Sequence, residues 1–312
     1  MKLVFMGTPD FSVPCLDALI KAGHEVAAVF TQPDKPKNRG HKLSMPPVKE
    51  FAVEKGIEVY QPLSLRKGDD ALSSLDTLKK IAPDCIVVVA YGQILPKEIL
   101  ELPKFGCVNV HASLLPKYRG AAPIQRCIID GETKTGVTTM YMAEGLDTGD
   151  MIMKKELEIS ERMTASELHD ALSEIGAELI VKTLEALENG SAERTAQTEE
   201  NTCYAKMLTK ETCKINFNNS AKTVYNQIRG LSSSPCAFAF LDDKRLKVYF
   251  AELVDKTFDA QAGEIVDETD FTVCCGDKKG LRLTDIQLEG GKRINVAEFL
   301  RGRKITRGTL LS

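Results

Sequence analysis

The chain has 312 residues, of which 43% are hydrophobic and 27% charged, and its net charge is −3. This length favours two domains, and the composition is typical of a soluble globular protein with a sizeable core. The small net charge excludes a globally basic nucleic-acid-binding protein, so only local clusters of Lys and Arg can serve a polyanionic partner.

The nine cysteines do not predict a disulfide framework, because their number is odd and the chain is long enough to bury a core. No CxxC pair occurs, so we expect no metal site. The apolar run before Pro9 is too short for a signal peptide, and the run 85–91 is too short to span a membrane. We therefore expect a cytoplasmic protein with no membrane partner.

Strand and helix patterns alternate through the first half of the chain. The predicted strands are 3–6, 26–30, 57–60, 85–90, 107–111 and 137–142, and the predicted helices are 13–22, 46–55, 72–81, 124–130 and 164–188. The run 85–90 is continuously apolar and β-branched, as in a strand covered on both faces. Repeated βα units predict an α/β fold with a Rossmann-like, mostly parallel sheet and helices on both faces.

The pattern changes after Gly190. Residues 191–202 are polar and lack periodicity, which favours an interdomain linker. One more helix is predicted at 221–229, and short strands follow at 236–241, 246–253, 263–266, 271–275 and 281–288. Such a series predicts a small antiparallel barrel or sandwich. We therefore expect a first domain at 1–190, a linker at 191–206 and a second domain at 207–312.

The first predicted strand ends at Gly7, in the sequence G-T-P, where a dinucleotide-binding chain would carry GxGxxG. Two of the three glycines are missing, and Pro9 lacks the N–H that a phosphate cradle needs. The turn therefore disfavours NAD and favours an ordinary tight βα connection.

The most informative segment is FGCVNVHASLLPKYRGAAPI, at 105–124. On a strand, Asn109 and His111 share one face, near the carboxyl end where open α/β sheets hold ligands. An isolated histidine near an apolar strand is more often a structural residue, but the neighbouring asparagine favours a reactive site.

A second candidate is the loop EGLDTGD, at 144–150, directly after a predicted strand. Asp147 between two glycines can simply cap the local backbone, or its carboxylate can face His111 and favour the protonated ring. Asn109 and His111 can donate to a tetrahedral oxyanion, and Asp147 can help to remove an amine proton. The three side chains therefore suit the attack of an amine on a carbonyl.

These motifs together resemble the formyltetrahydrofolate-dependent formyltransferases. The family's Asn-x-His strand, SLLP turn and downstream Asp loop correspond here to 109–111, 113–116 and 145–150. Further similar stretches are MGTPDFSVP, FTQPDKPKNRGHKL, VAYGQILP and IRGLSSSP, so the resemblance extends from Leu3 to about Leu310.

The resemblance implies that 10-formyltetrahydrofolate is the donor and initiator methionyl-tRNA the acceptor. It implies that Asn109 and His111 stabilise the tetrahedral intermediate and that Asp147 sets the protonation of His111 and relays the proton. The folate pocket would be bordered by 143–146 and by Ser113, Leu114, Leu115, Pro116, Gln93, Ile94 and Leu95. The leucines are equally plausible as core residues. The second domain would be OB-like and bind tRNA.

A run of charged residues is ordinarily only a solvent-exposed surface. The resemblance implies that two basic segments of this chain bind tRNA. The first would approach the tRNA acceptor end, where phosphates favour Lys and Arg. The second would let the C-terminal domain bind tRNA. Their residues are Lys35, Lys37, Arg39, His41 and Lys42 in the first segment, and Arg301, Arg303 and Lys304 in the second.

Two alternatives stay open at this point, and a third is disfavoured by the length of the chain. A formyltransferase acting on a small nucleotide or amino-sugar nucleotide would share Asn109, His111 and Asp147 but would not need the basic segments. A non-catalytic tRNA-binding module would need only the basic segments. An NAD(P)-linked folate enzyme would need a further dehydrogenase domain, for which 312 residues leave no room.

Overall fold

The structure, a computed structural model, describes residues 1–37 and 42–312. The chain forms two units, each of which is described by itself. The N-terminal unit comprises 1–120, 135–157 and 169–204, and the C-terminal unit comprises 121–134, 158–168 and 205–312. The predicted boundaries at 190 and 207 stay a prediction.

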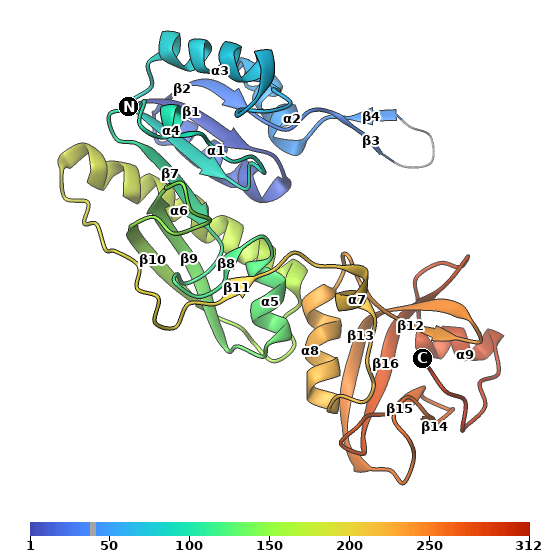
Figure 1. Ribbon diagram of the computed structural model, residues 1–312. Helices are drawn as coiled ribbons and strands as arrows, with labels where there is room; N and C mark the ends of the chain where they lie inside the picture. The colour runs from blue at the N-terminus through green and yellow to red at the C-terminus, as the bar shows by residue number, and fades with distance from the viewer. Residues whose placement is uncertain (38–41) are drawn as a thin grey trace. The chain divides into compact units, whose positions relative to one another are not determined.

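A seven-stranded sheet forms the centre of the N-terminal unit (Figure 1). Its strands, in spatial order, are β10 (Met151–Glu158), β9 (Lys134–Tyr141), β7 (Cys107–His111), β6 (Cys85–Val89), β1 (Lys2–Gly7), β2 (Glu25–Phe30) and β5 (Val59–Tyr60). The pairs from β7 to β5 are all parallel, whereas β9 runs antiparallel to β7. Strands β1 and β6 are buried almost throughout, because helices cover both of their faces.

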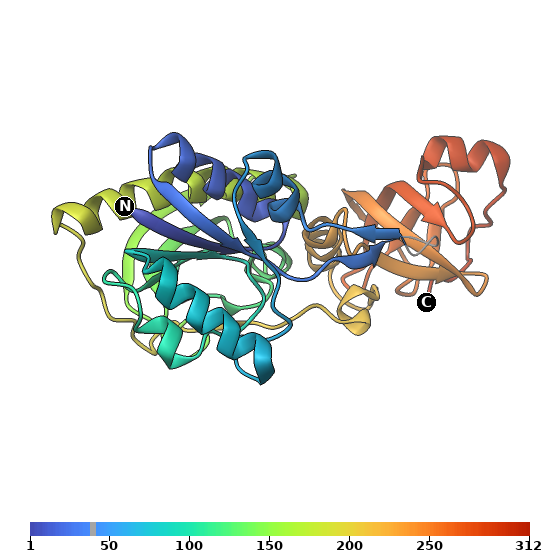
Figure 2. The ribbon, with the colours of Figure 1, turned by 90° about the horizontal axis from the view of Figure 1, so that it is seen from above.

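Helices lie on both faces of this sheet (Figure 2). One face is covered by α1 (Val13–Lys21), α2 (Pro47–Glu54) and α6 (Ala165–Asn189), and the other by α3 (Gly68–Ile81) and α4 (Lys97–Leu100). A Cβ on Gly176 of α6 would lie 3.0 Å from Val110 Cγ1 and 3.6 Å from Cys15 Sγ. Glycine therefore permits the close approach of α6 to β7 and α1.

Short elements connect these layers. The 3₁₀ turn Asp10–Ser12 precedes α1, and β3 (Lys35–Lys37) pairs antiparallel with β4 (Lys42–Ser44) in a hairpin. The two-residue strand β8 (Arg119–Gly120) pairs with β11 (Tyr204–Ala205). Segment 191–206, predicted as a linker, thus contributes a strand beside the end of the SLLPKYRG sequence.

The C-terminal unit is built on an antiparallel sheet with the order β12 (Ala237–Leu241), β13 (Lys244–Thr257), β16 (Lys279–Leu288), β15 (Thr272–Cys274) and β14 (Ile265–Asp267), and β17 (Ile294–Asn295) pairs with β16. Its helices are α5 (Pro123–Ile129), α7 (Lys210–Cys213), α8 (Ala221–Leu231) and α9 (Val296–Gly302). Alternate residues of β12 point inward, so Ala237, Ala239 and Leu241 join the core of this unit.

The predicted fold class, a mostly parallel sheet with helices followed by an antiparallel β part, is confirmed. Strand β10, however, was not predicted. Among the described residues no helix is long and apolar enough to cross a membrane, and no cluster of three metal-binding side chains occurs. All nine cysteines are free thiols, and only Cys203 is exposed.

Candidate active site

Strand β7 presents Asn109 and His111 on one face of the sheet, as the two-residue period predicted. Asn109 lies opposite Val88 of β6 and Met140 of β9, and its side chain is half-buried. His111 ends the strand and is only 6% exposed. Both side chains therefore occupy a site that excludes most water.

The partners of the His111 ring define where its protons lie. Nε2 is 2.9 Å from Tyr118 O, which can only accept, so Nε2 carries a proton and donates it there. The other nitrogen, Nδ1, is 3.7 Å from Asp147 Oδ2. A second ring proton, on Nδ1, would therefore face the Asp147 carboxylate.

The loop that carries Asp147 reaches His111 by folding back over the sheet. The register pairs Tyr141 with Val108 and Thr138 with His111, so β9 ends beside the beginning of β7. A Cβ on Gly149 would collide with Tyr141 O, so the return of the loop requires glycine there. Asp147 itself has φ +52°, a conformation that aspartate tolerates better than most residues.

A second contact ties Asp147 to the segment after the SLLP turn. Asp147 Oδ2 accepts a hydrogen bond of 2.8 Å from the backbone N–H of Gly120. The same oxygen therefore faces both Gly120 and His111. The structure thus brings Asp147 and His111 together, as predicted. The loop that carries Asp147 follows β9, which runs antiparallel to β7.

The SLLP turn is held by side chains that we did not predict. Thr138 Oγ1 donates to Ser113 O at 2.7 Å and accepts from Leu115 N at 3.1 Å. Lys154 Nζ donates to Leu115 O. Leu115 packs with Met140 and Met151 in a small buried cluster, whereas Leu114 and Pro116 are half-buried. Leu115 is therefore a core residue, and hydrogen bonds from Thr138 and Lys154 hold the backbone of the turn.

The second predicted border of the folate pocket, 93–95, also serves local structure. Gln93 accepts from Leu65 N at 2.9 Å and donates to Pro62 O at 2.8 Å. Leu95 lies in the core cluster beneath α3 and α4, whereas Ile94 is exposed. A role of Gln93 and Leu95 in folate binding stays a prediction. Because both side chains serve local structure, such a role would use the backbone of this segment and the exposed side chain of Ile94.

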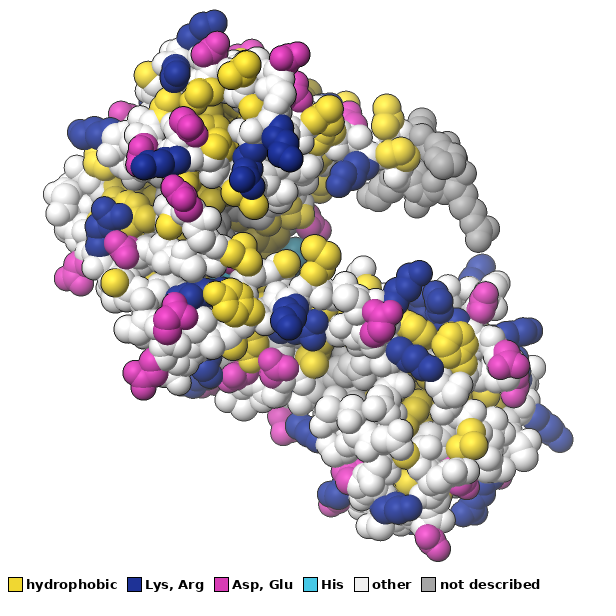
Figure 3. All heavy atoms as spheres, in the orientation of Figure 1, with side chains coloured by type: hydrophobic (Ala, Val, Ile, Leu, Met, Phe, Trp, Pro, Cys, Tyr) yellow, Lys and Arg dark blue, Asp and Glu magenta, His cyan; other side chains and the backbone are white. Residues whose placement is uncertain are grey.

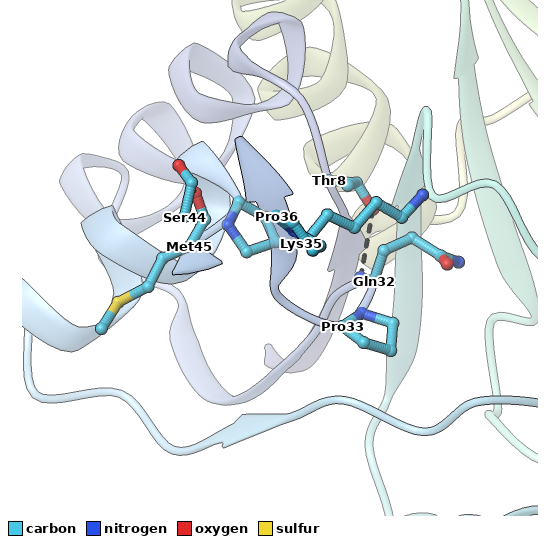
Figure 4. A pocket seen from close by; sticks show the side chains of 8 residues that line it. Thr8, Gln32, Pro33, Lys35, Pro36, Ser44 and Met45 are labelled. Carbon is cyan, nitrogen blue, oxygen red and sulfur yellow. Dashed lines mark hydrogen bonds between the residues drawn. The ribbon is translucent and has the colours of Figure 1, made fainter. Parts of the chain in front are cut away.

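A largely apolar cavity of about 200 Å³ lies at the base of the β3–β4 hairpin (Figure 4). Its lining comes from the end of β1, the segment after β2, and the hairpin. The lining residues are Thr8, Gln32, Pro33, Lys35, Pro36, Ser44, Met45 and Pro46. Thr8 Oγ1 and Gln32 Nε2 both donate to Tyr91 O, two residues after the end of β6, so the cavity adjoins the carboxyl ends of neighbouring parallel strands.

Of the predicted basic residues around the hairpin, the structure describes the side chain of Lys35 alone. Lys35 is exposed on β3. Arg39, His41 and the side chains of Lys37 and Lys42 lie outside the described residues. Their contact with tRNA stays a prediction.

The predicted basic residues near the C-terminus are only partly available to a ligand. Arg301, in the last turn of α9, and Lys304, two residues beyond this helix, are exposed. Arg303 donates to Asp242 Oδ2 at 2.8 Å, so this cation is already paired.

A basic pocket that we did not predict lies beside β12 and β13, with a volume of about 300 Å³. Lys210, Arg245 and Lys247 contribute cations to its lining, and the Arg245 guanidinium lies 4.8 Å from the centre of the Phe238 ring. None of its described lining residues is acidic. Figure 3 shows Lys and Arg side chains gathered beside apolar ones over this part of the C-terminal unit. Cations beside an aromatic ring suit a nucleic-acid strand.

Gln197 also contacts the Asp147 loop, and sequence reasoning did not select it as a site residue. Gln197 donates to the carbonyl oxygens of Asp147 and Gly149, and it accepts from Arg119 Nε. Gln197 belongs to a polar run without periodicity, which carries no pattern that would single it out.

Chemically, the site combines two potential oxyanion donors with a carboxylate. Asn109 offers an amide N–H, and His111 offers Nδ1–H when protonated, since Nε2–H is held by Tyr118. Asp147 supplies the negative charge opposite the ring. Among the described side chains, no Ser or Cys is paired with His111, so the arrangement favours direct transfer over a covalent intermediate.

Comparisons with known proteins agree over both halves of the chain. A family model described as formyl transferase matches residues 1–184, and one described as formyl transferase, C-terminal domain, matches 207–304. The methionyl-tRNA formyltransferase of Clostridium acetobutylicum is 51% identical, over 100% of this chain and 99% of the relative. The protein of the same name from Clostridioides difficile is 49% identical over the full length of both chains.

Solved structures share the fold at lower identity. A sugar 3N-formyl transferase solved in the presence of dTDP and 5-N-formyl-THF has a TM-score of 0.67 and 21% identity, and the match covers 94% of this chain and 99% of that chain. HypX from Aquifex aeolicus, solved with tetrahydrofolic acid, has a TM-score of 0.62 and 18% identity, over 96% of this chain and 47% of that chain.

Proposed function

Since the chain belongs to the formyl transferase family, we propose that it transfers the formyl group of 10-formyltetrahydrofolate to the α-amino group of methionyl initiator tRNA. The observation that carries this proposal is the identity of about half of all residues, over essentially the whole chain, with proteins named methionyl-tRNA formyltransferase. The sugar formyltransferase match, at 21% identity, supports the fold alone. The alternative of a small nucleotide acceptor is therefore disfavoured.

The folate donor is supported by the solved neighbours, which contain 5-N-formyl-THF or tetrahydrofolic acid. The residues of this chain suit a donor whose formyl carbon lies beside Asn109 and His111. The backbone of the SLLP turn, held by Thr138, offers one wall for such a ligand.

In the proposed reaction the amine nitrogen of the acceptor attacks the formyl carbon, and the carbonyl oxygen becomes an oxyanion. Asn109 and the Nδ1–H of protonated His111 donate to that oxyanion. The attacking nitrogen loses a proton to the Asp147–His111 pair, which returns a proton to the departing folate nitrogen as the carbon–nitrogen bond to folate breaks. The products are formylated amine and tetrahydrofolate, and atoms and charge balance.

We further propose two tRNA contacts, one on each unit. The segment 35–44 carries the first, through Lys35 and the other basic residues predicted there from the sequence. The basic pocket carries the second, because Arg245 and Lys247 can neutralise phosphates while Phe238 offers a ring for stacking. Arg303, being paired with Asp242, contributes less than its position in the sequence suggests.

A panel of acceptors tests the reaction. The purified chain is given the formyl donor with methionyl initiator tRNA, with glycinamide ribonucleotide, or with an amino-sugar nucleotide. We expect formylation of the tRNA only. Formylation of a small nucleotide without formylation of the tRNA would overturn the proposal, and no transfer to any acceptor would favour a non-catalytic module.

The tRNA contacts are tested separately. We expect Arg39→Ala and Lys42→Ala to raise the KM for tRNA more than that for folate. We expect the pair Arg245→Ala and Lys247→Ala to do the same and to reduce the salt dependence of tRNA binding. Lys256→Ala is a matched control, because Lys256 also lies over an aromatic ring, that of Phe258, but does not line the basic pocket. An effect of the control as large as that of the pair would contradict the assignment.

A further inference from the structure

The segment after α6 contacts both the Asp147 loop and the segment that follows the SLLP turn. Thr195 and Met151 exchange two backbone hydrogen bonds, of 2.8 and 2.9 Å, so the segment is anchored beside the start of β10. Further along, Cys203 O accepts from Arg119 N at 3.0 Å. Between these anchors Gln197 is half-buried and turned toward the Asp147 loop. We call residues 195–203 the strap.

The side chain of Gln197 makes three hydrogen bonds to oxygen and nitrogen partners, and its Nε2 also contacts Met140 Sδ at 3.8 Å. Its Nε2 donates to Asp147 O and to Gly149 O, both at 2.8 Å, and its Oε1 accepts from Arg119 Nε at 2.9 Å. The two carbonyls can only accept and the guanidinium can only donate, so these partners fix the orientation of the amide. Gln197 therefore connects the Asp147 loop to the segment that follows the SLLP turn.

Arg119, the partner of Gln197, is unusual for a charged residue because it is only 1% exposed. Burial of a guanidinium is costly unless its donors are satisfied. The Glu199 carboxylate that accepts from Nη1 at 3.1 Å is itself 82% exposed, so this ion pair is weakened by solvent. The bond to Gln197 thus orients a buried cation whose ion-pair partner, Glu199, is largely exposed.

The two segments joined by this contact supply both partners of the His111 ring. Tyr118, directly before Arg119, provides the carbonyl that holds Nε2, and Asp147 provides the carboxylate that faces Nδ1. Gly120, directly after Arg119, donates to the same carboxylate oxygen. A displacement of either segment would therefore move a partner of the catalytic ring.

The Asp147 loop needs such a restraint. Asp147 has a positive φ, and its loop folds back from the far end of β9, so the strand does not itself hold the carboxylate near His111. We propose that Gln197 and Arg119 are positioning residues that hold Asp147 and Tyr118 in register on the two sides of the His111 ring. This inference rests on the proposed formyl transfer, and it assigns the strap a role in positioning the residues that carry out the reaction.

The test replaces Gln197 while keeping its volume. Gln197→Met removes all three hydrogen bonds, and Gln197→Glu keeps the acceptor for Arg119 but turns a carboxylate toward two carbonyl oxygens. We expect kcat to fall by about 10²-fold in both variants, the size of effect that follows a misplacement of about 1 Å in a catalytic group. The KM values for tRNA and folate should stay within about twofold of wild type, because the strap is inferred to act on the chemical step.

Thr198→Ala is the matched control, since Thr198 is an exposed neighbour on the same strap. Circular dichroism at the assay temperature shows whether each variant is folded. A kcat within about twofold of wild type in Gln197→Glu would overturn the inference, as would an equal loss in Thr198→Ala or a loss that merely follows the unfolded fraction.

The wild-type chain separates the two hypotheses. If wild type does not formylate methionyl-tRNA, the proposed function fails. If wild type is active and Gln197→Glu is equally active, only the role of the strap fails.

Discussion

The contact between His111 and Asp147 allows one prediction to be worked out in full. Asp147→Asn removes the negative charge but leaves an oxygen that can still accept from Gly120 N, so the loop keeps this hydrogen bond. The substitution therefore isolates the electrostatic part of the interaction with the ring. If His111 must be protonated to donate from Nδ1 to the oxyanion, loss of the charge should slow formyl transfer.

The size of the effect follows from the distance. Opposite unit charges separated by 3.7 Å, as Nδ1 and Oδ2 are, attract by about 4 kcal/mol at an effective dielectric constant of about 20. The side chains of His111 and Asp147 are only 7% and 14% exposed, so solvent screens little of this attraction. Since about 1.4 kcal/mol corresponds to a factor of ten, the rate should fall by roughly 10³-fold.

Single-turnover formylation of methionyl-tRNA with saturating enzyme measures this step directly. Asp150→Asn is the control, because Asp150 lies near the end of the same loop but pairs with Arg194 at 3.3 Å. We expect a loss of less than about threefold in the control. A loss below about tenfold in Asp147→Asn, with a folded variant, would refute the argument that the carboxylate acts by its charge.

Three further predictions follow from single contacts. His111→Ala should lower kcat by about 10²–10³-fold or more, the cost of removing an oxyanion donor, whereas His169→Ala, at an outer His–Asp contact, should leave single-turnover rates unchanged. Thr138→Val should lower the free energy of unfolding by about 2–4 kcal/mol, because Leu115 N and Ser113 O lose their buried partner, and thermal unfolding should report a lower Tm. Hydrogen bonds from Lys49 and Gln61 hold the pKa of Asp34 below its ordinary value, so its contribution to stability is present above the ordinary pKa and is lost as pH falls through the lowered one. Urea unfolding at several acid pH values should therefore show a weaker pH dependence in Asp34→Asn than in wild type.

The parts of the site that could be predicted from sequence are those encoded by local patterns. The two-residue period of β7 places Asn109 and His111 on one face whatever their neighbours are. The continuous apolar run of β6 predicts a strand covered on both sides, as observed. Both inferences need only a few consecutive residues.

The parts that could not be predicted depend on contacts between distant segments. Nothing in the sequence of β9 reveals that it runs antiparallel to β7, so the route by which Asp147 reaches His111 is visible only in the structure. Thr138 supports the SLLP turn from 25 residues away, and Gln197 supports the Asp147 loop from 50 residues away. A hydrogen bond of this kind leaves no periodicity in either segment.

It is also difficult to predict from the sequence which basic side chains are available to bind a ligand. A basic side chain in a sequence predicts exposure, but it does not show whether an acid lies opposite. Arg303 is paired with Asp242, whereas Arg245 and Lys247 alternate with apolar residues in β13 and so read only as a strand pattern. We therefore propose the basic pocket as a candidate tRNA contact, while the contact of the exposed Arg301 and Lys304 with tRNA stays a prediction.

The strap and the Asp147 carboxylate make one joint prediction. If Gln197 acts on catalysis by holding Asp147 beside His111, its replacement should matter little once the charge of Asp147 is gone. In a double-mutant cycle we therefore expect Gln197→Met to cost about 10²-fold in wild type but less than about threefold in the Asp147→Asn background. Independent effects would instead multiply. Multiplied losses in a folded double variant would mean that Gln197 serves the site by another route, through Arg119 and the Tyr118 carbonyl, because that side of the ring is unchanged by Asp147→Asn.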